Sequence, residues 1–488
     1  MASMTTTVTE TFWSKWSSNS TLNFVTRKAQ IAEPLKDEKS IRDDEIPEGF
    51  FTEEEVSRHS SPRDCWIIIN DKVYDVSKFA EKHPGGPIIF TQAGRNATDS
   101  FRLFHTAKAW QQLQEFHIGD LYNPEPVSEL LKDYRELRSL LLRSQMFKCS
   151  KAYYVYKAVT NFALLAASMA VISWSTTFWA VLLSSFLMGL FLQQCGWVAH
   201  DFAHNQVFEP RSSSGFLGGL FWGNVAQGFS LGWWKTKHNV HHAVTNECDE
   251  KYQPIDPDID TLPLLAWSNE ILATVDDRFI RSIISKQHLM FFPLLFLARL
   301  SWLYSSWAHV SSFDMHKSVR RAEKATLLAH YAGTLAIPLS FLPVSQAICW
   351  VILAELFSGF FLSVVFVVSH NGMELYNDPR DFVTAQLCST RNIKNQFFYD
   401  WFSGGLNWQI EHHLFPTIPR HNLHKVEPYV KALCAKHGLM YEEISLVSAV
   451  ASSFYRLRDV AAVARTSLQT SGRCDFGGAQ LEQRTSRR

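Results

Sequence analysis

The chain has 488 residues, a formal net charge of zero and 46% hydrophobic residues. The balanced charge argues against a nucleic-acid partner, and the eight scattered cysteines lack the dense spacing of a secreted disulfide framework. A chain of this length is expected to hold two or more domains.

The two ends of the chain differ in composition from its middle. Residues 1–46 are rich in Ser, Thr, Lys and Glu with little periodicity, which predicts a disordered N-terminal tail. Apolar residues concentrate between about 155 and 370, so this part is expected to lie in a membrane. We therefore expect a small soluble domain over residues 47–122, a linker over 123–152 and a membrane domain over 153–446.

The small domain begins with two short β-branched runs, at 66–69 and 73–76. Asn70-Asp71 between them is a pair typical of hairpin turns. The segment HPGG at 83–86 then places a histidine in a tight turn, and Phe104-His105 follows a polar helical stretch. These features predict a compact α+β domain that carries two prominent histidines.

Four motifs of this domain resemble the cytochrome b5 haem-binding domain: DCW at 64–66, YDV at 74–76, HPGG at 83–86 and GDL at 119–121. The resemblance implies that the domain binds haem b, with His83 and His105 as the two axial ligands. Two imidazoles on opposite sides of the iron give a six-coordinate haem suited to electron transfer and not to oxygen binding. His117 lies nearby, but Phe104-His105 falls where the family places its second ligand.

Four later stretches come close to the length of about 20 apolar residues that a membrane span needs. The turn inside each successive pair carries no charge, whereas the outer flanks are rich in Lys and Arg. This pattern predicts two hairpins that enter the membrane from the cytosol, with both termini cytosolic. The four predicted spans are 155–173, 176–195, 325–343 and 346–368.

Two further apolar stretches are predicted to lie in the membrane interface as half-buried helices. The stretch at 214–232 is glycine-rich and separates two histidine-rich motifs that have to meet at one site, so a single crossing there would part them. The stretch at 288–307 has basic residues on both sides and Arg299 inside it. The membrane domain is followed by a predicted C-terminal tail over 447–488, made of a trailing helix and a loose end.

Three histidine-rich motifs stand beside the apolar stretches: HDFAH at 200–204, HNVHH at 238–242 and QIEHH at 409–413. Residues three or four apart share one face of a helix, so each motif can present imidazoles to a common point. One such motif alone is as easily a set of interfacial histidines, but three in order on one side of a membrane favour a metal site. Together with His370 they make eight candidate ligands, too many for one tetrahedral zinc, so two metal ions are predicted. The eight are His200, His204, His238, His241, His242, His370, His412 and His413.

The order HxxxH, HxxHH and QxxHH behind a cytochrome b5-like domain resembles the front-end branch of the membrane fatty acid desaturases, most closely the Δ6 acyl-lipid desaturases of lower plants. The resemblance covers roughly residues 47–446. It implies an all-α membrane domain in which four transmembrane helices, interfacial helices and a cytosolic helical cap hold two iron ions, in the endoplasmic reticulum membrane. Gln409 is either a weak ligand to these ions or a hydrogen-bond partner of a neighbouring ligand.

The implied reaction is the O2-dependent insertion of a cis double bond between an existing double bond and the carboxyl end of a C18 polyunsaturated acyl chain. Linoleoyl and α-linolenoyl chains, carried by phospholipid, would become γ-linolenoyl and stearidonoyl chains. Electrons would pass singly from NADH through cytochrome b5 reductase and the tethered haem. The alternatives are a Δ5 or Δ8 fatty acid desaturase, a sphingolipid long-chain-base Δ8 desaturase and, in another class, a non-catalytic haem electron carrier with structural zinc. The sequence indicates no oligomeric state.

Two positions depart from the family pattern. Asn205 follows the first motif directly, at a position where many relatives have a second consecutive histidine. Trp408 precedes the third motif, where relatives usually carry Arg. Among the carboxylates near the motifs, Asp201 is predicted to accept a hydrogen bond from a ligand imidazole. The run DPDID at 256–260 is predicted to be a solvated loop and not a carboxylate metal site.

Overall fold

In the computed structural model, which describes residues 46–208, 212–311, 315–394 and 397–473, the β-branched runs of the N-terminal domain pair as neighbouring strands. Asn70 and Asp71 both take left-handed backbone conformations, with φ of 52° and 60°, and close the hairpin between them, which confirms the predicted turn. The sheet has the order β1-β6-β4-β3-β2, with β5 beside β3. Its strands are β1 (Phe50–Phe51), β2 (Ser60–Ser61), β3 (Asp64–Ile69), β4 (Lys72–Asp75), β5 (Arg95–Asn96) and β6 (His117–Leu121).

Short helices enclose both faces of this sheet. Ile67 and Ile69 face a core that includes Phe90, whereas Ile68 faces a second core with Val56. This small domain confirms the predicted α+β class. Its helices are α3 (Glu53–Arg58), α4 (Ser77–Ala80), α5 (Ile88–Thr91), α6 (Thr98–Phe104), α7 (Ala107–Leu113) and the 3-10 turn η3 (Gln114–Phe116).

The segment predicted as a linker contains a helix, α8 (Glu129–Arg143), that packs against both domains. The side chain of Tyr134 is buried, and its hydroxyl donates to the backbone oxygen of Leu414 at 2.8 Å. Arg135 makes two contacts of 2.8 Å with the carboxylate of Asp99 in the haem domain. Because α8 contacts both domains, it is a structural brace in addition to being a connection.

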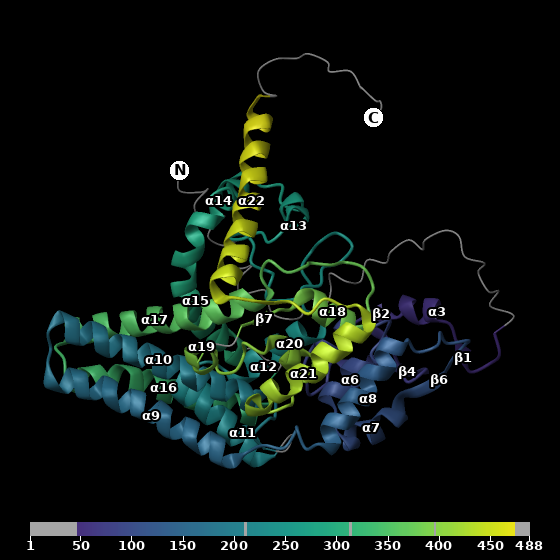
Figure 1. The fold of residues 1–488 in the computed structure, drawn as a ribbon, viewed down its shortest axis with the longest axis horizontal. Helices are drawn as coiled ribbons and strands as arrows, with labels where there is room; N and C mark the ends of the chain where they lie inside the picture. Colours follow the sequence, from purple (N-terminus) through teal and green to yellow (C-terminus); the bar gives the residue numbers. More distant parts are fainter. Residues whose placement is uncertain (1–45, 209–211, 312–314, 395–396, 474–488) are drawn as a thin grey trace.

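Four long helices lie side by side and form a bundle in which the chain reverses direction twice (Figure 1). At Gly189 the first pair packs closely against the second, because a Cβ there would lie only 2.7 Å from Cβ of Phe357. Buried Ser168 and Ser184 hydrogen-bond to each other within the bundle, and Trp350 donates to Ser184 at 2.8 Å. The four helices are α9 (Lys151–Trp174), α10 (Phe178–Ala203), α16 (Lys317–Leu339) and α17 (Val344–His370).

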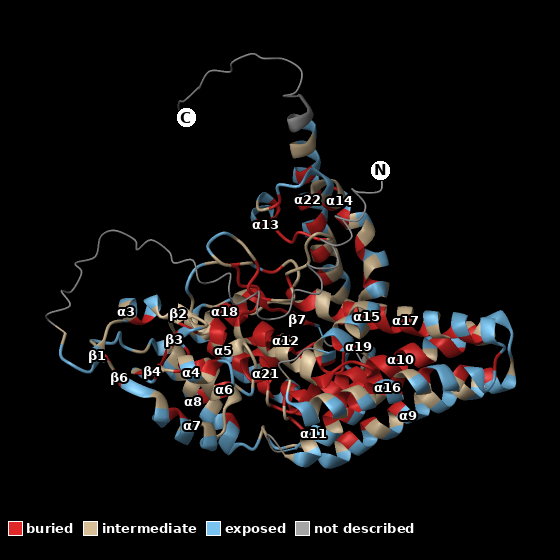
Figure 2. Cartoon of the chain, turned by 180° about the vertical axis from the view of Figure 1, so that it is seen from behind, coloured by how far each residue is buried: buried red, intermediate tan, exposed pale blue. Residues whose placement is uncertain are grey.

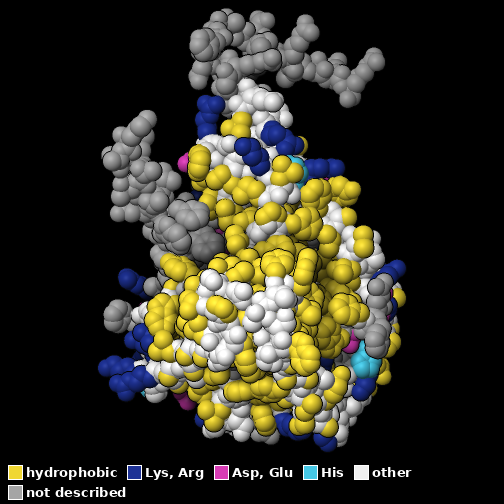
Figure 3. Space-filling model, turned by 90° about the vertical axis from the view of Figure 1, so that its left-hand side faces the viewer, with side chains coloured by type: hydrophobic (Ala, Val, Ile, Leu, Met, Phe, Trp, Pro, Cys, Tyr) yellow, Lys and Arg dark blue, Asp and Glu magenta, His cyan; other side chains and the backbone are white. Residues whose placement is uncertain are grey.

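The outer surface of this bundle is apolar. Val155, Val159 and Ile348 are each more than half exposed, and Figure 3, which looks onto the end of the bundle, shows hydrophobic side chains over most of that face. Apolar surface of this extent is unusual for a protein surrounded by water. With four helices that are long and apolar enough to cross a membrane, the chain is a multi-pass membrane protein.

Length and apolar composition select α9, α10, α15 (Gln287–Ser311) and α17 as helices that could cross a membrane. They do not select α16, which overlaps the span predicted at 325–343. The arrangement adds to this selection, because α16 also lies among the long helices of the bundle in Figure 1. α15 packs closely against α17, and its buried Arg299 pairs there with Glu355 at 2.7 Å.

A cap of shorter helices closes one end of the bundle, and buried residues concentrate where the two meet, around α10 and α12 (Figure 2). The segment predicted to be interfacial at 214–232 forms α11 and a π-helical stretch, η4, which packs against α10. The cap and its connections comprise α11 (Ser213–Gly219), η4 (Leu220–Gln227), α12 (Leu231–Ala243), α13 (Asn269–Ala273), α14 (Arg278–Ile284), α18 (Phe382–Ser389), β7 (Asn392–Ile393), α19 (Phe397–Ser403), α20 (Gln409–Leu414), α21 (Arg420–His437) and β8 (Glu443–Ile444).

The predicted C-terminal tail is in large part a helix of the membrane domain, α22 (Leu446–Arg473). Leu457 and Val460 of this helix are buried in a core shared with α14 and α15, and Gln287 donates to the backbone oxygen of Leu457 at 2.9 Å. The predicted trailing helix is therefore present as far as residue 473, and an apolar stripe on it packs against the domain. Residues 474–488, like 1–45 of the predicted N-terminal tail, lie outside the described residues.

Candidate dimetal centre and haem site

The first histidine motif forms the C-terminal end of α10. His200 and His204 are one turn apart, and the backbone N–H of His204 donates to the oxygen of His200. Asn205 follows with φ of 57°, a left-handed conformation that asparagine tolerates better than most residues. Asn205 therefore ends the helix at the point where the two imidazoles enter the cap, which accounts for an asparagine at this position.

One cluster of potential metal ligands joins three helices. The ligand atoms of His200, His204, His238 and His412, from α10, α12 and α20, all lie within 4.8 Å of one another, and all four residues are buried. The Nε2 atoms of His200 and His412 are 3.1 Å apart. Buried Nε2 of His204 has no hydrogen-bond partner among the described residues. An orphaned buried nitrogen that faces other imidazoles fits a metal ion at this position.

Burial also favours the protonation state that such a centre needs. It lowers the pKa of His204, His238 and His412 well below the ordinary value of a histidine, and the neighbouring imidazoles lower it further. These side chains are therefore neutral near pH 7. Neutral imidazole is the form that donates its lone pair to a metal.

A second cluster lies beside the first. The ligand atoms of His241, His370 and His413, from α12, α17 and α20, also lie within 4.8 Å of one another. The side-chain amide of Gln409 points to the same place, because its Nε2 is 3.0 Å from Nε2 of His370 and 3.3 Å from Nε2 of His413. Its Oε1 is buried without a partner among the described residues. Gln409 thus lies at the second cluster in a position from which either predicted role can be filled.

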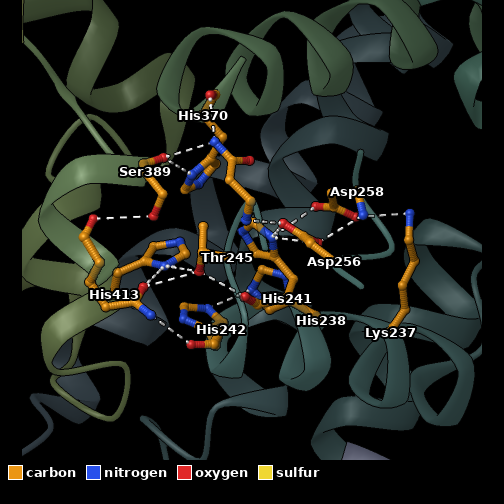
Figure 4. Close-up of polar contacts among 12 residues, drawn as sticks. Lys237, His238, His241, His242, Thr245, Asp256, Asp258, His370, Ser389 and His413 are labelled. Atoms are coloured by element: carbon orange, nitrogen blue, oxygen red, sulfur yellow. Dashed lines mark hydrogen bonds and ion pairs between the residues drawn. The ribbon is translucent and has the colours of Figure 1, made fainter. Parts of the chain in front are cut away.

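His242 lies between the two clusters. Its ring centroid is 4.2 Å from that of His413 in the second cluster and 4.7 Å from that of His412 in the first. Its Nε2 is 3.0 Å from Nε2 of His238. The fold therefore brings all eight histidines of the sequence prediction together, and Figure 4 shows five of them converging from α12, α17 and α20.

Hydrogen bonds from distant parts of the chain orient these rings (Figure 4). Nδ1 of His413 donates to Oε1 of Gln386 at 2.8 Å, and Nδ1 of His370 donates to the backbone oxygen of Ser389 at 3.1 Å. An acceptor on Nδ1 fixes the tautomer and leaves Nε2 to bind the metal. Gln386 and Ser389 belong to α18, and no motif or spacing in the sequence pointed to them.

The loop predicted to be solvated is part of the site. Asp256 is fully buried and accepts from Nδ1 of His241 at 2.9 Å, so the prediction of an exposed loop is wrong. Asp258 pairs with Lys237 at 2.9 Å. Burial alone would raise the pKa of Asp258, but Lys237 and His241 outweigh it and hold that pKa below the ordinary value. The carboxylates support the ligands and do not replace them.

Asp201 has the role that its position predicted. Its Oδ1 is 3.3 Å from Nδ1 of His200, while Oδ2 accepts from the hydroxyl of Tyr154 at 2.8 Å and pairs with Arg420 at 2.6 Å. Both oxygens of this buried carboxylate thus face a donor. The arrangement holds the carboxylate in place beside the first cluster.

Glu411, to which the sequence analysis assigned no role, anchors the third motif. Glu411 is fully buried and accepts from Asn392 and from the hydroxyl of Tyr441, both at 2.7 Å. Burial raises the pKa of Glu411 to about 7, against these hydrogen bonds. Trp408, at the start of the same helix, is buried in the apolar core beneath α20 and α21, where a charged side chain would need a partner.

The two predicted haem ligands face each other in the N-terminal domain. The ring centroids of His83 and His105 are 5.8 Å apart. Nδ1 of His83 donates to the oxygen of Gly86 at 3.0 Å, and Nδ1 of His105 donates to the oxygen of Phe101 at 3.1 Å, which makes Nε2 the candidate ligand atom of both. His117 instead contacts Asp120. The two donors and their facing rings fit a haem with an axial imidazole on each side.

Comparison with known proteins identifies both parts of the chain. Residues 176–445 match the family model described as fatty acid desaturase, and residues 52–122 match the one described as cytochrome b5-like heme/steroid binding domain. An acyl-lipid (9-3)-desaturase of Physcomitrium patens is 53% identical over 410 residues, which are 84% of this chain and 78% of that protein. Delta(8)-fatty-acid desaturase 2 of Arabidopsis thaliana is 32% identical (86% and 95% covered), and an acyl-lipid (9-3)-desaturase of Borago officinalis is 33% identical (85% and 94% covered).

Proposed function

This chain belongs to the fatty acid desaturase family, as a front-end acyl-lipid desaturase with a fused cytochrome b5 domain, and we propose that it inserts a Δ6 double bond into C18 polyunsaturated acyl chains. Its family membership makes it an oxidoreductase, so the alternative of a non-catalytic electron carrier with structural zinc is set aside. The observation that carries the chemistry is the pair of buried imidazole clusters with His242 between them, because these eight histidines together can hold two iron ions.

Support for the Δ6 position comes from the relatives. The names of two of them, 53% and 33% identical, describe a double bond placed three carbons from position 9, toward the carboxyl end. We infer that linoleoyl and α-linolenoyl chains, carried by phospholipid, become γ-linolenoyl and stearidonoyl chains. A Δ8 activity is the second candidate, because Δ8 desaturases of Arabidopsis thaliana and Euglena gracilis are 32% and 35% identical.

The residues of the chain prepare the centre for this reaction. When bound, two iron ions together with O2 supply the oxidising power to remove two hydrogens from adjacent methylenes. His200, His238 and His412 would hold one ion from three different helices, so that the helices would fix its position. Asp256 and Gln386 keep ligand rings in the required tautomer. The complete burial of these groups excludes water that would otherwise consume the oxidant.

Gln409 contributes a neutral side chain to the second cluster. We propose that its carbonyl oxygen binds the second ion, directly or through water, with the amide turned so that Oε1 replaces Nε2 opposite His370 and His413. The short distances from the amide to both imidazoles support this role. The other role, in which Gln409 only hydrogen-bonds a ligand, predicts an unchanged iron content in Gln409→Ala.

Two electrons are required for each double bond, and the haem domain delivers them singly. We propose that an NADH-dependent cytochrome b5 reductase reduces the haem held by His83 and His105. The rings of both histidines are half-buried and the domain lies at one side of the molecule, where a reductase can approach it. The tether keeps the haem at a high effective concentration near the dimetal centre.

We also propose the orientation in the membrane. The spans are α9, α10, α16 and α17, because these helices run together and the basic residues of their flanks lie at the end that carries the cap. α15 then lies in the interface, although its composition alone would permit a crossing. Both termini and the dimetal centre would face the cytosol in the endoplasmic reticulum.

Product analysis tests this function. Yeast that expresses the full chain is fed C18 and C20 polyunsaturated acids, and the new double bond is located by mass spectrometry. We expect γ-linolenic and stearidonic acid, found first in phospholipid. A new double bond at position 8 of C20 acids, or in sphingolipid long-chain bases, would contradict the Δ6 assignment and keep the desaturase.

A further inference from the structure

The haem-binding turn of the N-terminal domain lies directly against the helix that carries the second histidine motif. A Cβ built on Gly86 would lie 3.3 Å from Cγ2 of Thr236, so backbone and side chain are in contact there. The short helix α5, which begins at Ile88, packs along α12, and the two lie next to each other in Figure 2. Gly86 has φ of 74°, so the turn that makes this approach requires a glycine.

The contact extends beyond the turn and combines apolar packing with an ion pair. Ile88 packs with Val240, Val244 and Ile255 in a small cluster between the two domains. At its edge, Arg95 of the haem domain pairs with Glu247 at 2.6 Å, and the Glu247 side chain is only 8% exposed. A carboxylate this buried depends on its cationic partner, so the pair holds the two surfaces in one register.

A short chain of contacts links the haem ligand to the dimetal centre across this surface. Nδ1 of His83 donates to the backbone oxygen of Gly86 at 3.0 Å. Gly86 contacts Thr236, and Thr236 precedes the metal-ligand candidate His238 by two residues on α12. The route therefore consists of one hydrogen bond, one van der Waals contact and a few covalent bonds.

We propose that the haem domain is docked on α12 by the Arg95–Glu247 pair and that electrons pass from the haem to the dimetal centre through His83, Gly86 and Thr236. The proposal rests on the desaturase function, because it needs both a haem and a dimetal acceptor. Each ferrous haem is oxidised to ferric haem as it gives up one electron. Two such electrons, with two protons and two hydrogens of the acyl chain, reduce one O2 to two molecules of water.

A second contact supports a docked domain over one that moves freely on its tether. Arg135 of α8 is bound to Asp99 of the haem domain through two hydrogen bonds of 2.8 Å, while Tyr134 of the same helix is bonded to α20. The haem domain is thus held on two sides, by α8 and by α12. Electron transfer within one molecule should then be independent of the protein concentration.

Stopped-flow measurement of haem reoxidation tests the docking. The full-length holoenzyme in lipid nanodiscs is reduced with NADH and cytochrome b5 reductase and then mixed with O2 in the presence of linoleoyl phosphatidylcholine. Arg95→Glu places two carboxylates together, so we expect at least about tenfold slower reoxidation with an unchanged haem spectrum and iron content. The double variant Arg95→Glu with Glu247→Arg should restore a rate close to that of the wild type.

A matched control makes the same charge change away from α12. Arg58 on α3 pairs with Glu54 of its own helix and is 61% exposed, so Arg58→Glu should reoxidise at the wild-type rate. Hydrogen exchange along α12 reports docking without reference to activity, and it should increase around Thr236 in Arg95→Glu alone. Unchanged reoxidation and unchanged exchange in Arg95→Glu would overturn the docked arrangement.

Thr236→Ala separates the route from the docking, because it removes the side-chain atoms that touch Gly86 and leaves the ion pair in place. We expect slower reoxidation with wild-type hydrogen exchange. A wild-type rate in this variant would remove Thr236 from the route. If wild-type holoenzyme shows no reoxidation that depends on acyl lipid, the desaturase function itself fails, which is a different outcome from an insensitive Arg95→Glu variant.

Discussion

The two metal-binding regions of this protein are built in opposite ways. In the haem domain, His83 and His105 are oriented by backbone oxygens three and four residues away, and both rings are half-buried. In the dimetal centre, the ligand rings are fully buried, and acceptors such as Asp256 and Gln386 come from separate segments of the chain. An electron-entry site has to remain accessible to a reductase, whereas a site of C–H oxidation has to exclude water. Orientation by nearby backbone oxygens leaves the haem ligands accessible, whereas orientation by side chains from distant segments buries the ligands of the dimetal centre.

The largest effect is expected from a direct ligand of the dimetal centre. His412→Ala removes one of the four imidazoles of the first cluster, so desaturation should be lost and the iron content should fall. Iron analysis of the purified protein and product formation in yeast measure this. His424 is an exposed residue of α21, so His424→Ala serves as the control and should behave as the wild type. Retention of most of the activity in His412→Ala would remove His412 from the ligand set.

The comparison predicts a different kind of loss at the haem. His83→Ala should abolish the haem absorbance and NADH-driven desaturation while the iron of the dimetal centre stays bound, because the two sites lie in separate domains. Absorbance spectra and iron analysis distinguish the two losses. His117→Ala should keep its haem, since His117 faces Asp120 and not His83. Unchanged product formation in His83→Ala would show that the fused haem is dispensable.

A smaller effect is expected where a long-range acceptor orients a ligand. Asp256→Asn leaves the ligands in place but weakens the hold on His241, so activity or iron affinity should drop by about 10- to 100-fold. Titration of the iron-free protein with Fe²⁺ measures the affinity. Asp276→Asn, at an exposed site, provides the control. An affinity equal to that of the wild type would mean that His241 needs no orienting partner.

The smallest effect is expected at the anchor of the third motif. Tyr441→Phe removes one of the two hydrogen bonds to buried Glu411, which should lower the free energy of unfolding by about 1–3 kcal/mol. Thermal unfolding of the purified protein should show a lower midpoint, with the iron content unchanged. Tyr429→Phe changes a hydroxyl on a residue that is 40% exposed, so it should leave the midpoint in place. A midpoint unaffected by Tyr441→Phe would show that Asn392 alone satisfies Glu411.

The histidine motifs and the haem-domain motifs could be predicted because each depends on spacing within a few residues. A helix places His200 and His204 on one face whatever surrounds it, and Asn70-Asp71 forms its turn from local backbone preferences. The wrong prediction, that of a solvated loop at Asp256, concerned a feature that depends on tertiary packing. Asp256 looked solvated because charge and proline favour exposed loops, and only the packing against His241 shows that the carboxylate is buried.

The packing partners of several helices also depended on the tertiary structure. The sequence predicted a charged helical linker and a trailing C-terminal helix without a packing partner for either, but Tyr134 and Leu457 are buried in tertiary cores. Composition also ranks α15 above α16 as a membrane span, whereas the arrangement of the helices puts α16 in the bundle. An amphipathic or polar helix can be assigned a partner only when its neighbours are known.

By itself, the amino-acid sequence determined the two domains, the eight histidines and the family, because these depend on short-range spacing and composition. The tertiary structure alone decided which histidines share a cluster, that Gln409 joins the second one and that Gln386, Ser389 and Asp256 orient the rings. It also brought the turn of His83 against α12. These contacts join residues far apart in the chain, so the packing of the helices creates them and no local sequence pattern predicts them.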